Sequence, residues 1–202
     1  VLLGPARKSK IFTEKEKKII AYHEAGHAVV AHMLPNADPV HKVSIISRGR
    51  AGGYTLKLPT EDKNLHTYKE FVDDLAVMMG GMAIEKIQFG DLTTGPGSDI
   101  QSATNLAKRI VTQYGMSKKL APRTFGEKEE MIFLGKEITE KTDYSDKTAE
   151  AIDKEIEALI NTALGTATRI LKENKNKVGD VVEALLEKET LEKDAFAAIM
   201  NT

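Results

Sequence analysis

The sequence predicts a mainly α-helical fold that carries a small β-sheet of two or three strands and ends in a C-terminal helical bundle. Helical periodicity runs through most of the 202 residues, and 41% of the side chains are hydrophobic, enough for the core of one domain. Two segments with strand character, residues 43–47 and 54–58, flank a glycine-bearing turn, which is typical of a hairpin or small sheet. From residue 146 onward only helix patterns follow.

A capping box opens the first predicted helix, residues 13–34. Thr13 stands three residues before Glu16, so each side chain can bond the backbone N–H of the other residue. The apolar residues that follow fall on one broad stripe at about 100° per residue, and His23 and His27 lie on the same stripe. Both histidines are therefore expected to face inward, and a Pro-Asn pair ends the helix.

Helix signals recur along the rest of the chain. Further helices are expected over residues 67–89, 98–114, 146–174, 177–188 and 191–200. The first of these holds a glycine pair in its interior, and Ser98 with Gln101 forms a second capping box. We divide the chain into a linker (1–12), a core (13–140) and a C-terminal helical segment packed on that core (141–202).

Charge and composition exclude several functions. The net charge is −1 and the 29% charged residues are mixed in sign, so nothing favours a nucleic-acid partner. The chain has no cysteine, which excludes disulfides and thiolate metal ligands. The apolar stretch over residues 75–84 is too short to span a bilayer, and no signal peptide is visible. We therefore expect this chain to be soluble.

The stretch His23-Glu24-Ala25-Gly26-His27 is the H-E-x-x-H pattern of zinc peptidases. On a helix, positions i and i+4 lie on one face, so two imidazoles at this spacing can bind one metal ion. Glu24 then lies close enough to take a proton from a metal-bound water. The alternative is a core helix with two partnered histidines, an expensive way to build a core because buried polar groups must be satisfied. The motif thus predicts a catalytic metal site.

The third ligand of this site is not part of the motif. A catalytic zinc usually has three protein ligands and one open position. The pattern H-E-x-x-H-x-x-G-x-x-H fails here, because Val30 and Met33 occupy its last two defined positions. No acid follows before Glu61 apart from Asp38 in the turn after the helix, and the next candidate is Asp99 in the first turn of the helix at 98–114. From the residues alone, Asp99 is either a ligand or an ordinary first-turn acid.

Several stretches together resemble the peptidase domain of the FtsH family, whose members are ATP-dependent, membrane-anchored zinc proteases of bacteria, mitochondria and chloroplasts. The stretches are H-E-A-G-H-A-V (23–29), G-Y-T (53–55), G-G-M-A-I-E (80–85), T-T-G with D-I (93–95, 99–100), Y-G-M-S (114–117), F-L-G (133–135) and L-L-E-K-E-T (185–190). They cover essentially the whole chain in the family's order. The resemblance implies a zincin-like helical peptidase domain and a zinc metalloendopeptidase activity.

The resemblance also implies roles for two acids. It makes Asp99 the third ligand, so that His23, His27 and Asp99 would hold one Zn²⁺ per chain, with Glu24 as the catalytic base. It places Glu85 near the metal, where its carboxylate would orient a ligand histidine. The alternative for Glu85 is an ordinary acid on a helix surface.

Family members carry an ATPase module and transmembrane helices ahead of the peptidase. This chain has no G-x-x-x-x-G-K-[ST] phosphate loop, so we interpret it as a separated peptidase portion, with residues 1–12 as the linker from an absent ATPase domain. ATP and the membrane would then be engaged only through the missing part. The resemblance implies a homo-hexamer that degrades unfolded, misfolded, regulatory or membrane proteins in protein quality control. It also implies a location on the cytoplasmic face of the bacterial inner membrane, or on an organelle membrane.

Two other functions remain open at this point, namely a zinc hydrolase acting on small amides and a scaffold with a dead site. The intact Glu24 argues against the scaffold, since a dead site has no need of a base. Either predicted strand could bind an extended substrate by edge pairing, or both could form a purely structural hairpin. The three other histidines, at positions 32, 41 and 66, have no partner at ligand spacing and are expected outside the site.

Overall fold

The computed structural model describes residues 12–47, 52–59, 64–126 and 143–201. Its elements are α1 (Glu14–Met33), β1 (Val40–Ser44), β2 (Tyr54–Lys57), α2 (Tyr68–Met78), α3 (Gly80–Phe89), α4 (Gly97–Thr112), α5 (Asp146–Glu173), α6 (Lys175–Lys188), β3 (Thr190–Glu192) and α7 (Lys193–Met200). The predicted mainly α fold with a small sheet is confirmed. Most of the predicted linker (1–12) and the F-L-G stretch (133–135) lie outside the described residues.

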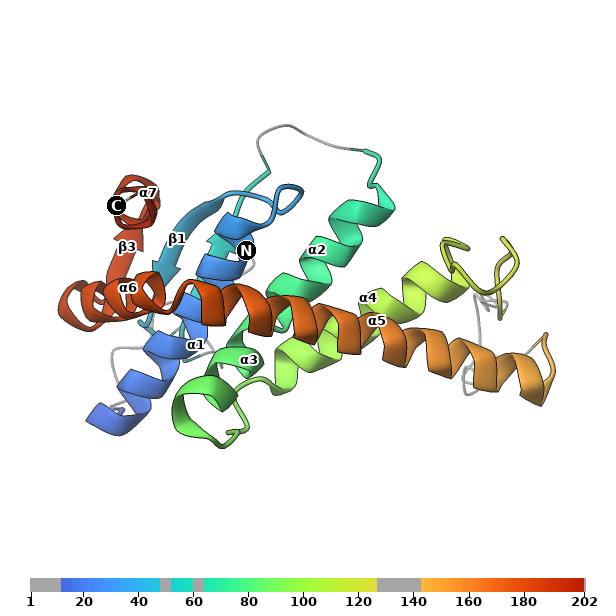
Figure 1. Ribbon diagram of the computed structural model, residues 1–202, viewed down its shortest axis with the longest axis horizontal. Coiled ribbons are helices and arrows are strands. Elements are labelled where there is room, and N and C mark those ends of the chain that lie inside the picture. Colours follow the sequence, from blue (N-terminus) through green and yellow to red (C-terminus); the bar gives the residue numbers. More distant parts are fainter. Residues whose placement is uncertain (1–11, 48–51, 60–63, 127–142, 202) are drawn as a thin grey trace, which may run out of the picture.

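Helix α1 begins at the predicted capping box. The Glu16 backbone N–H donates to Thr13 Oγ1 at 3.2 Å, and the Thr13 N–H donates to Glu16 Oε2 at 2.8 Å. The helix packs against α3, α6 and β1, so elements distant in sequence surround it. Figure 1 shows α1 with α3 and β1 beside it and α5 crossing in front. The motif helix is therefore enclosed by the rest of the domain.

The helix expected over residues 67–89 is two helices, and the prediction of one continuous helix is wrong. Helix α2 ends and α3 begins at Met79, whose ψ of −4° departs from helical geometry. The reason lies in packing against α1, where Gly80 meets Gly26. A Cβ on Gly80 would lie 2.8 Å from the Gly26 carbonyl oxygen. The break lets α3 take its own direction along α1.

Helix α4 begins one residue earlier than expected, and the predicted capping box at Ser98 is wrong. Pro96 occupies the N-cap position, and no side chain caps the helix. The φ of Pro96 is −67°, so proline suits this position without a side-chain cap. Ser98 therefore lies inside the first turn, and Gln101 donates to Asn105 on the same helix instead.

The sheet is antiparallel with strand order β2-β1-β3. Strand β1 ends earlier than the predicted segment at 43–47, and β3 falls on residues assigned in part to the last helix. The third strand closes one side of β1, pairing Val43 with Leu191 as well as with Thr55 of β2. Because β1 is central, it cannot offer an edge to a substrate, and only β2 and β3 are outer strands among the described elements.

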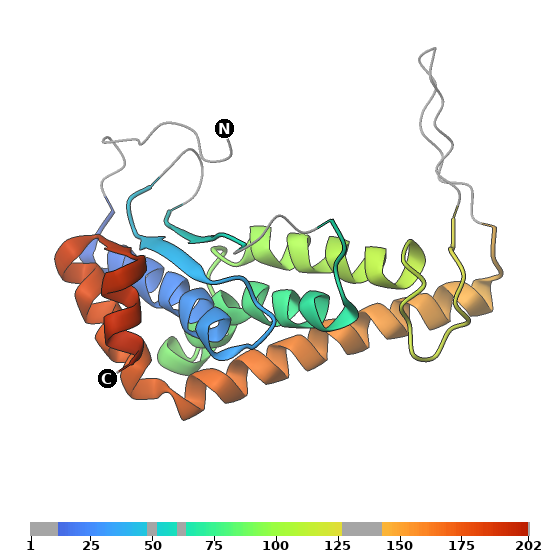
Figure 2. The ribbon, with the colours of Figure 1, turned by 90° about the horizontal axis from the view of Figure 1, so that it is seen from above.

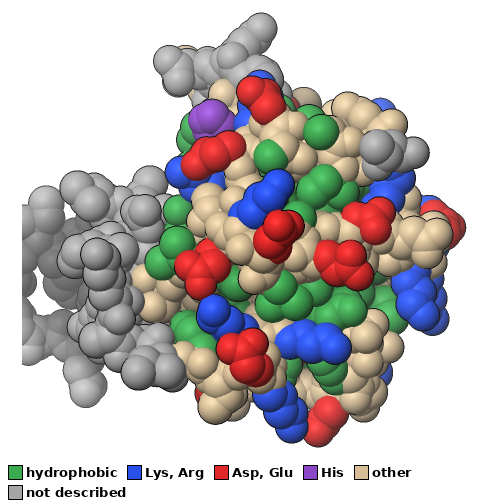
Figure 3. Space-filling view, turned by 90° about the vertical axis from the view of Figure 1, so that its left-hand side faces the viewer, with side chains coloured by type: hydrophobic (Ala, Val, Ile, Leu, Met, Phe, Trp, Pro, Cys, Tyr) green, Lys and Arg blue, Asp and Glu red, His purple; other side chains and the backbone are tan. Residues whose placement is uncertain are grey.

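Helix α5 supports the other helices. Figure 2 shows it running along the molecule beneath α2, α3 and α4, and it contacts each of them. Helices α6 and α7 turn back onto α1 and the sheet. Figure 3 shows the end of the molecule seen from the left-hand side of Figure 1, where acidic and basic side chains alternate. No described helix is long and apolar enough to cross a membrane.

Candidate metal centre

The two motif histidines lie together on the inner face of α1. Their Nε2 atoms are 3.1 Å apart, and their rings meet at a centroid distance of 4.7 Å. His27 is only 8% exposed, while the side chain of His23 is 12% exposed. The i, i+4 spacing therefore brings two imidazole nitrogens to one point, as expected from helical geometry.

Asp99 reaches the same point from the first turn of α4. Its Oδ2 lies 3.1 Å from His23 Nε2 and 3.5 Å from His27 Nε2. The three potential ligand atoms lie within 4.8 Å of one another. The positive end of the α4 dipole favours the charged carboxylate that a ligand needs. Two neutral nitrogens and one carboxylate oxygen form a donor set that suits Zn²⁺, and the side chain of Asp99 is 28% exposed, so the site opens to solvent.

The outer nitrogen of each imidazole has its own acceptor. His27 Nδ1 lies 2.7 Å from the Val77 carbonyl oxygen, and His23 Nδ1 lies 2.9 Å from Glu85 Oε1. An Nδ1–H that donates to these oxygens leaves the Nε2 lone pair of each ring directed at the common point. The α2 C-terminus and α3 thus fix the tautomer and orientation of both rings.

Glu85 connects His23 to the loop that precedes Asp99. Its other oxygen, Oε2, accepts from the Thr93 N–H at 3.0 Å and from Thr93 Oγ1 at 2.9 Å. Thr93 Oγ1 in turn accepts from the Gly95 N–H at 3.0 Å. Glu85 is only 1% exposed, so the alternative of a helix-surface acid is wrong. Thr93 belongs to the T-T-G stretch of the family resemblance, but its bond to Glu85 and the contact of Val77 with His27 were not predicted, because both depend on tertiary packing.

Close helix packing also shapes the site. A Cβ on Gly81 would lie 2.3 Å from Cε1 of the His23 ring, and one on Gly26 would lie 2.6 Å from the Gly80 carbonyl oxygen. Only residues without side chains let α3 approach α1 this closely. The glycine pair noted inside the predicted helix at 67–89 therefore makes room for the ring of His23.

The electrostatics of the cluster favour a shared proton in the metal-free protein. Burial lowers the pKa of His23, but the hydrogen bonds with Asp99 and Glu85 outweigh it and raise the pKa to about 10. Burial raises the pKa of Asp99, yet its hydrogen bonds with His23 and His27 hold the pKa well below its usual range. A proton on His23 is what a bound cation would replace.

Glu24 lies beside the cluster and is 6% exposed. Burial raises its pKa, and the neighbouring histidines and the Thr55 hydroxyl act in the opposite direction. Thr55 Oγ1 donates to Glu24 Oε2 at 2.8 Å. A carboxylate held next to a metal site in this way can serve as a general base. Two sequence signals could have pointed to this contact, namely the polar Thr55 in an alternating strand and the G-Y-T stretch (53–55) of the family resemblance.

Residues 10–199 match the family described as "Peptidase family M41". The chain belongs to peptidase family M41. Among curated proteins, it is 52% identical over 201 residues to "ATP-dependent zinc metalloprotease FtsH 1" of Sphaerobacter thermophilus, an alignment that covers 100% of this chain and 31% of the relative. It is 48% identical over 202 residues to "ATP-dependent zinc metalloprotease FtsH" of Thermotoga maritima, covering 100% of this chain and 33% of the relative. The chain thus spans about a third of the length of these relatives, and the resemblance to FtsH is confirmed.

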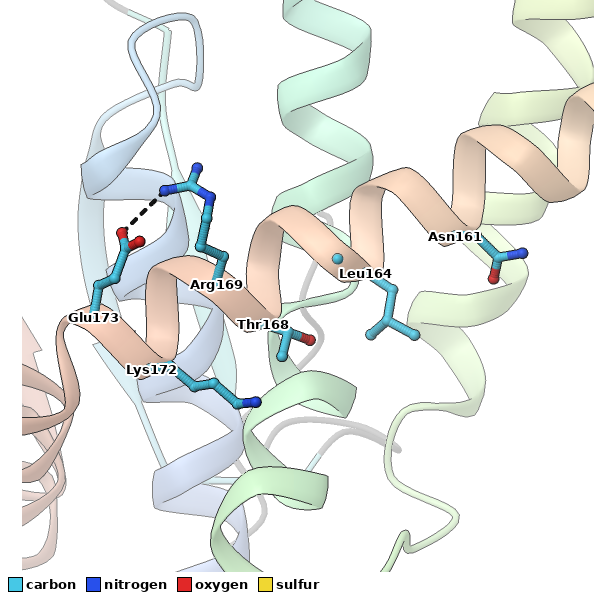
Figure 4. Close-up of a pocket in the computed structure, with 7 residues that line it drawn as sticks. Asn161, Leu164, Thr168, Arg169, Lys172 and Glu173 are labelled. Carbon is cyan, nitrogen blue, oxygen red and sulfur yellow. Dashed lines mark hydrogen bonds and ion pairs between the residues drawn. The ribbon is translucent and has the colours of Figure 1, made fainter.

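Other features of this M41 domain lie away from the metal centre. The His32 ring stands 5.8 Å from the Phe196 ring, and the His66 ring stands 5.7 Å from the Phe71 ring, centroid to centroid. A hollow of about 600 Å³ lies along α5. Two of the residues that line it, Arg169 and Glu173, form an ion pair at 3.0 Å and point toward each other in Figure 4. None of the residues that line this hollow belongs to the cluster around His23.

Proposed function

We propose that this M41 domain is a zinc-dependent endopeptidase in which His23, His27 and Asp99 bind one Zn²⁺ and Glu24 is the general base. The observation that carries the proposal is the convergence of three ligand atoms within 4.8 Å beside a buried carboxylate. Both relatives described above are named zinc metalloproteases. Zinc, when bound, polarises a water molecule and the scissile carbonyl.

The residues of this chain divide the remaining work. Glu24 takes the proton of the attacking water and passes it to the amine nitrogen that leaves. Glu85 accepts from the Nδ1–H of His23, and the Val77 carbonyl accepts from the Nδ1–H of His27. These bonds fix the orientation of the two ligand rings. Burial of Glu24 makes its proton affinity higher than that of an ordinary glutamate, which suits a base that must accept and then release a proton.

An extended substrate backbone fits the sheet beside this site. Strand β2 is an outer strand and contacts α1, and its Thr55 touches Glu24, so a peptide paired along β2 would pass close to the base. Main-chain pairing is indifferent to most side chains, which suits an enzyme that cuts many proteins. Of the two strands considered from sequence, β2 is therefore the proposed substrate edge.

We further propose that the domain acts within a longer ATP-driven protease. Support comes from the relatives, which are named ATP-dependent and are about three times as long. In that protein, residues 13–140 would form the peptidase core and residues 141–202 its helical support, joined to the ATPase by residues 1–12. Following the family resemblance, the protein would be a homo-hexamer at the cytoplasmic face of a bacterial inner membrane, or at an organelle membrane. It would degrade unfolded and membrane proteins.

Metal analysis and proteolysis of three proteins test the proposal, namely the wild type, Glu24→Gln and His27→Ala. We expect one zinc per chain in the first two and loss of zinc in the third, with cleavage of an unfolded protein such as casein by the wild type alone. Full zinc content in His27→Ala would contradict the ligand assignment. Casein left intact while small amides are cleaved would indicate an amidase instead.

A further inference from the structure

Thr55 occupies an inward position on strand β2. It pairs with Val43 across the antiparallel ladder, and directly opposed residues project from the same face of a sheet. Val43 is fully buried, so this face is the one that packs on the core. Strand alternation favours an apolar side chain at such a position, and a hydroxyl placed there needs a hydrogen-bond partner.

The partner of this hydroxyl is the base of the proposed reaction. Thr55 Oγ1 lies 2.8 Å from Glu24 Oε2 and 3.2 Å from the Glu24 backbone carbonyl oxygen. A hydroxyl has one hydrogen to donate, and the shorter distance and the negative charge both favour the carboxylate. The contact fastens the end of a flexible side chain on α1 to a strand.

Gly53 also contacts the Glu24 carboxylate. A Cβ on Gly53 would lie 2.9 Å from both Cγ and Oε1 of Glu24, and 2.7 Å from the Ser44 carbonyl oxygen. The Glu24 head group therefore lies between a position that tolerates no side chain and a hydroxyl that binds one of its two oxygens. With Oε2 held by Thr55, Oε1 is left as the oxygen for proton transfer.

We propose that Thr55 is a positioning residue for Glu24, which fixes the carboxylate so that Oε1 reaches the attacking water. The proposal rests on the proposed peptidase function. A base must lie within hydrogen-bond reach of the proton that it accepts, and a misplacement of about 1 Å can cost roughly 100-fold in rate. Hydrogen-bond partners of metal ligands typically contribute about 10- to 100-fold to metal affinity or activity, and we expect an effect of the same size for the partner of the base.

The test compares Thr55→Val, which keeps the shape of the side chain, with Thr55→Ser, which keeps the hydroxyl. Thr162→Val is the matched control, because Thr162 lies on the exposed face of α5 and donates to the Ala158 carbonyl there. Cleavage of a short fluorogenic peptide by each zinc-loaded chain gives kcat and KM. Chelator competition gives the zinc affinity, and thermal unfolding gives Tm. Crystal structures of zinc-loaded wild type and Thr55→Val give the position of the Glu24 carboxylate.

We expect Thr55→Val to lower kcat about 10- to 100-fold with KM, zinc affinity and Tm near those of the wild type, and to show a displaced carboxylate. Thr55→Ser should recover most of the lost kcat, and Thr162→Val should match the wild type. A kcat within twofold of wild type in Thr55→Val, or an equal loss in Thr55→Ser, would overturn the proposal. If the wild type binds zinc but cleaves nothing, the peptidase proposal fails, and an unmoved carboxylate in Thr55→Val then refutes the positioning role by itself.

Discussion

Replacing Gly81 with alanine adds a single methyl group at the contact between α3 and the His23 ring. The new Cβ would lie 2.3 Å from Cε1 and 2.6 Å from both ring nitrogens, whereas ordinary contacts begin near 3.4 Å. The ring must therefore move by about 1 Å or rotate, since the helix backbone behind the methyl group is less free to move. A functional site tolerates displacements of only about 0.5 Å in its binding groups.

We expect Gly81→Ala to weaken zinc binding by about 10- to 100-fold, because the displaced ring no longer aims Nε2 at the common point. The fold should survive, since overpacking costs about 1–3 kcal/mol and alanine recovers up to about 1 kcal/mol of helix propensity. Chelator competition gives the zinc affinity and thermal unfolding gives the stability. Gly179→Ala on α6 is the matched control, because a Cβ there meets nothing within 4 Å.

The control should bind zinc like the wild type. Its free energy of unfolding should rise by about 0.5–1 kcal/mol, because alanine has less backbone freedom than glycine in the unfolded chain. Zinc affinity in Gly81→Ala within twofold of the wild type would refute the reasoning. It would show that the ring has room to spare and that the glycine pair serves only the packing of α3 on α1.

Three further predictions concern Glu85, the proton on His23 and the residue that ends α6. Glu85→Gln should lower zinc affinity about 10- to 100-fold in chelator competition, because a neutral amide orients His23 less strongly, and unchanged affinity would reduce Glu85 to a loop anchor. The pKa of His23 is raised from 6.5 to about 10 in the metal-free protein, so protonation of His23 stabilises the fold. This contribution to the free energy of unfolding is complete below pH 6.5 and is lost as the pH rises toward 10. Zinc must displace the same proton, so its apparent affinity should rise about tenfold per pH unit between pH 7 and 9 in buffered-zinc titrations, and a flat profile would contradict the shared proton. Glu189 has a left-handed φ of 58°, so Glu189→Gly should raise the free energy of unfolding by about 1 kcal/mol, and a loss of stability would show that its ion pair with Lys17 matters more.

The sequence predicts best what depends on neighbouring residues. The Thr13 capping box is a local pattern, and it is present in the structure. The prediction that α1 buries a single stripe is wrong, because residues 24–31 are buried on every side of the helix where other elements enclose it. The Ser98 capping box failed although its pattern was equally good, because Pro96 had already supplied the start of α4. The break at Met79 was missed because its cause, the contact between Gly80 and Gly26, joins residues far apart in the chain.

The same distinction applies to the site. His23, Glu24 and His27 follow from five consecutive residues, whereas Asp99 could be named only with the help of a family resemblance. Its approach depends on how the start of α4 is placed against α1, which no local pattern encodes. The contacts of Thr55 and Gly81 with the motif are likewise long-range, so the strand hydroxyl and the glycine pair gained a role only when the packing was known.

The central claim is that Asp99 completes a three-residue zinc site with His23 and His27. Anomalous diffraction at the zinc edge, from crystals of the zinc-loaded wild type, tests it most directly. The account predicts one anomalous peak per chain, bonded to the two Nε2 atoms and to Oδ2 of Asp99 at about 2.0–2.2 Å. A peak at another place, or a peak on the two histidines with Glu85 in place of Asp99, would contradict it.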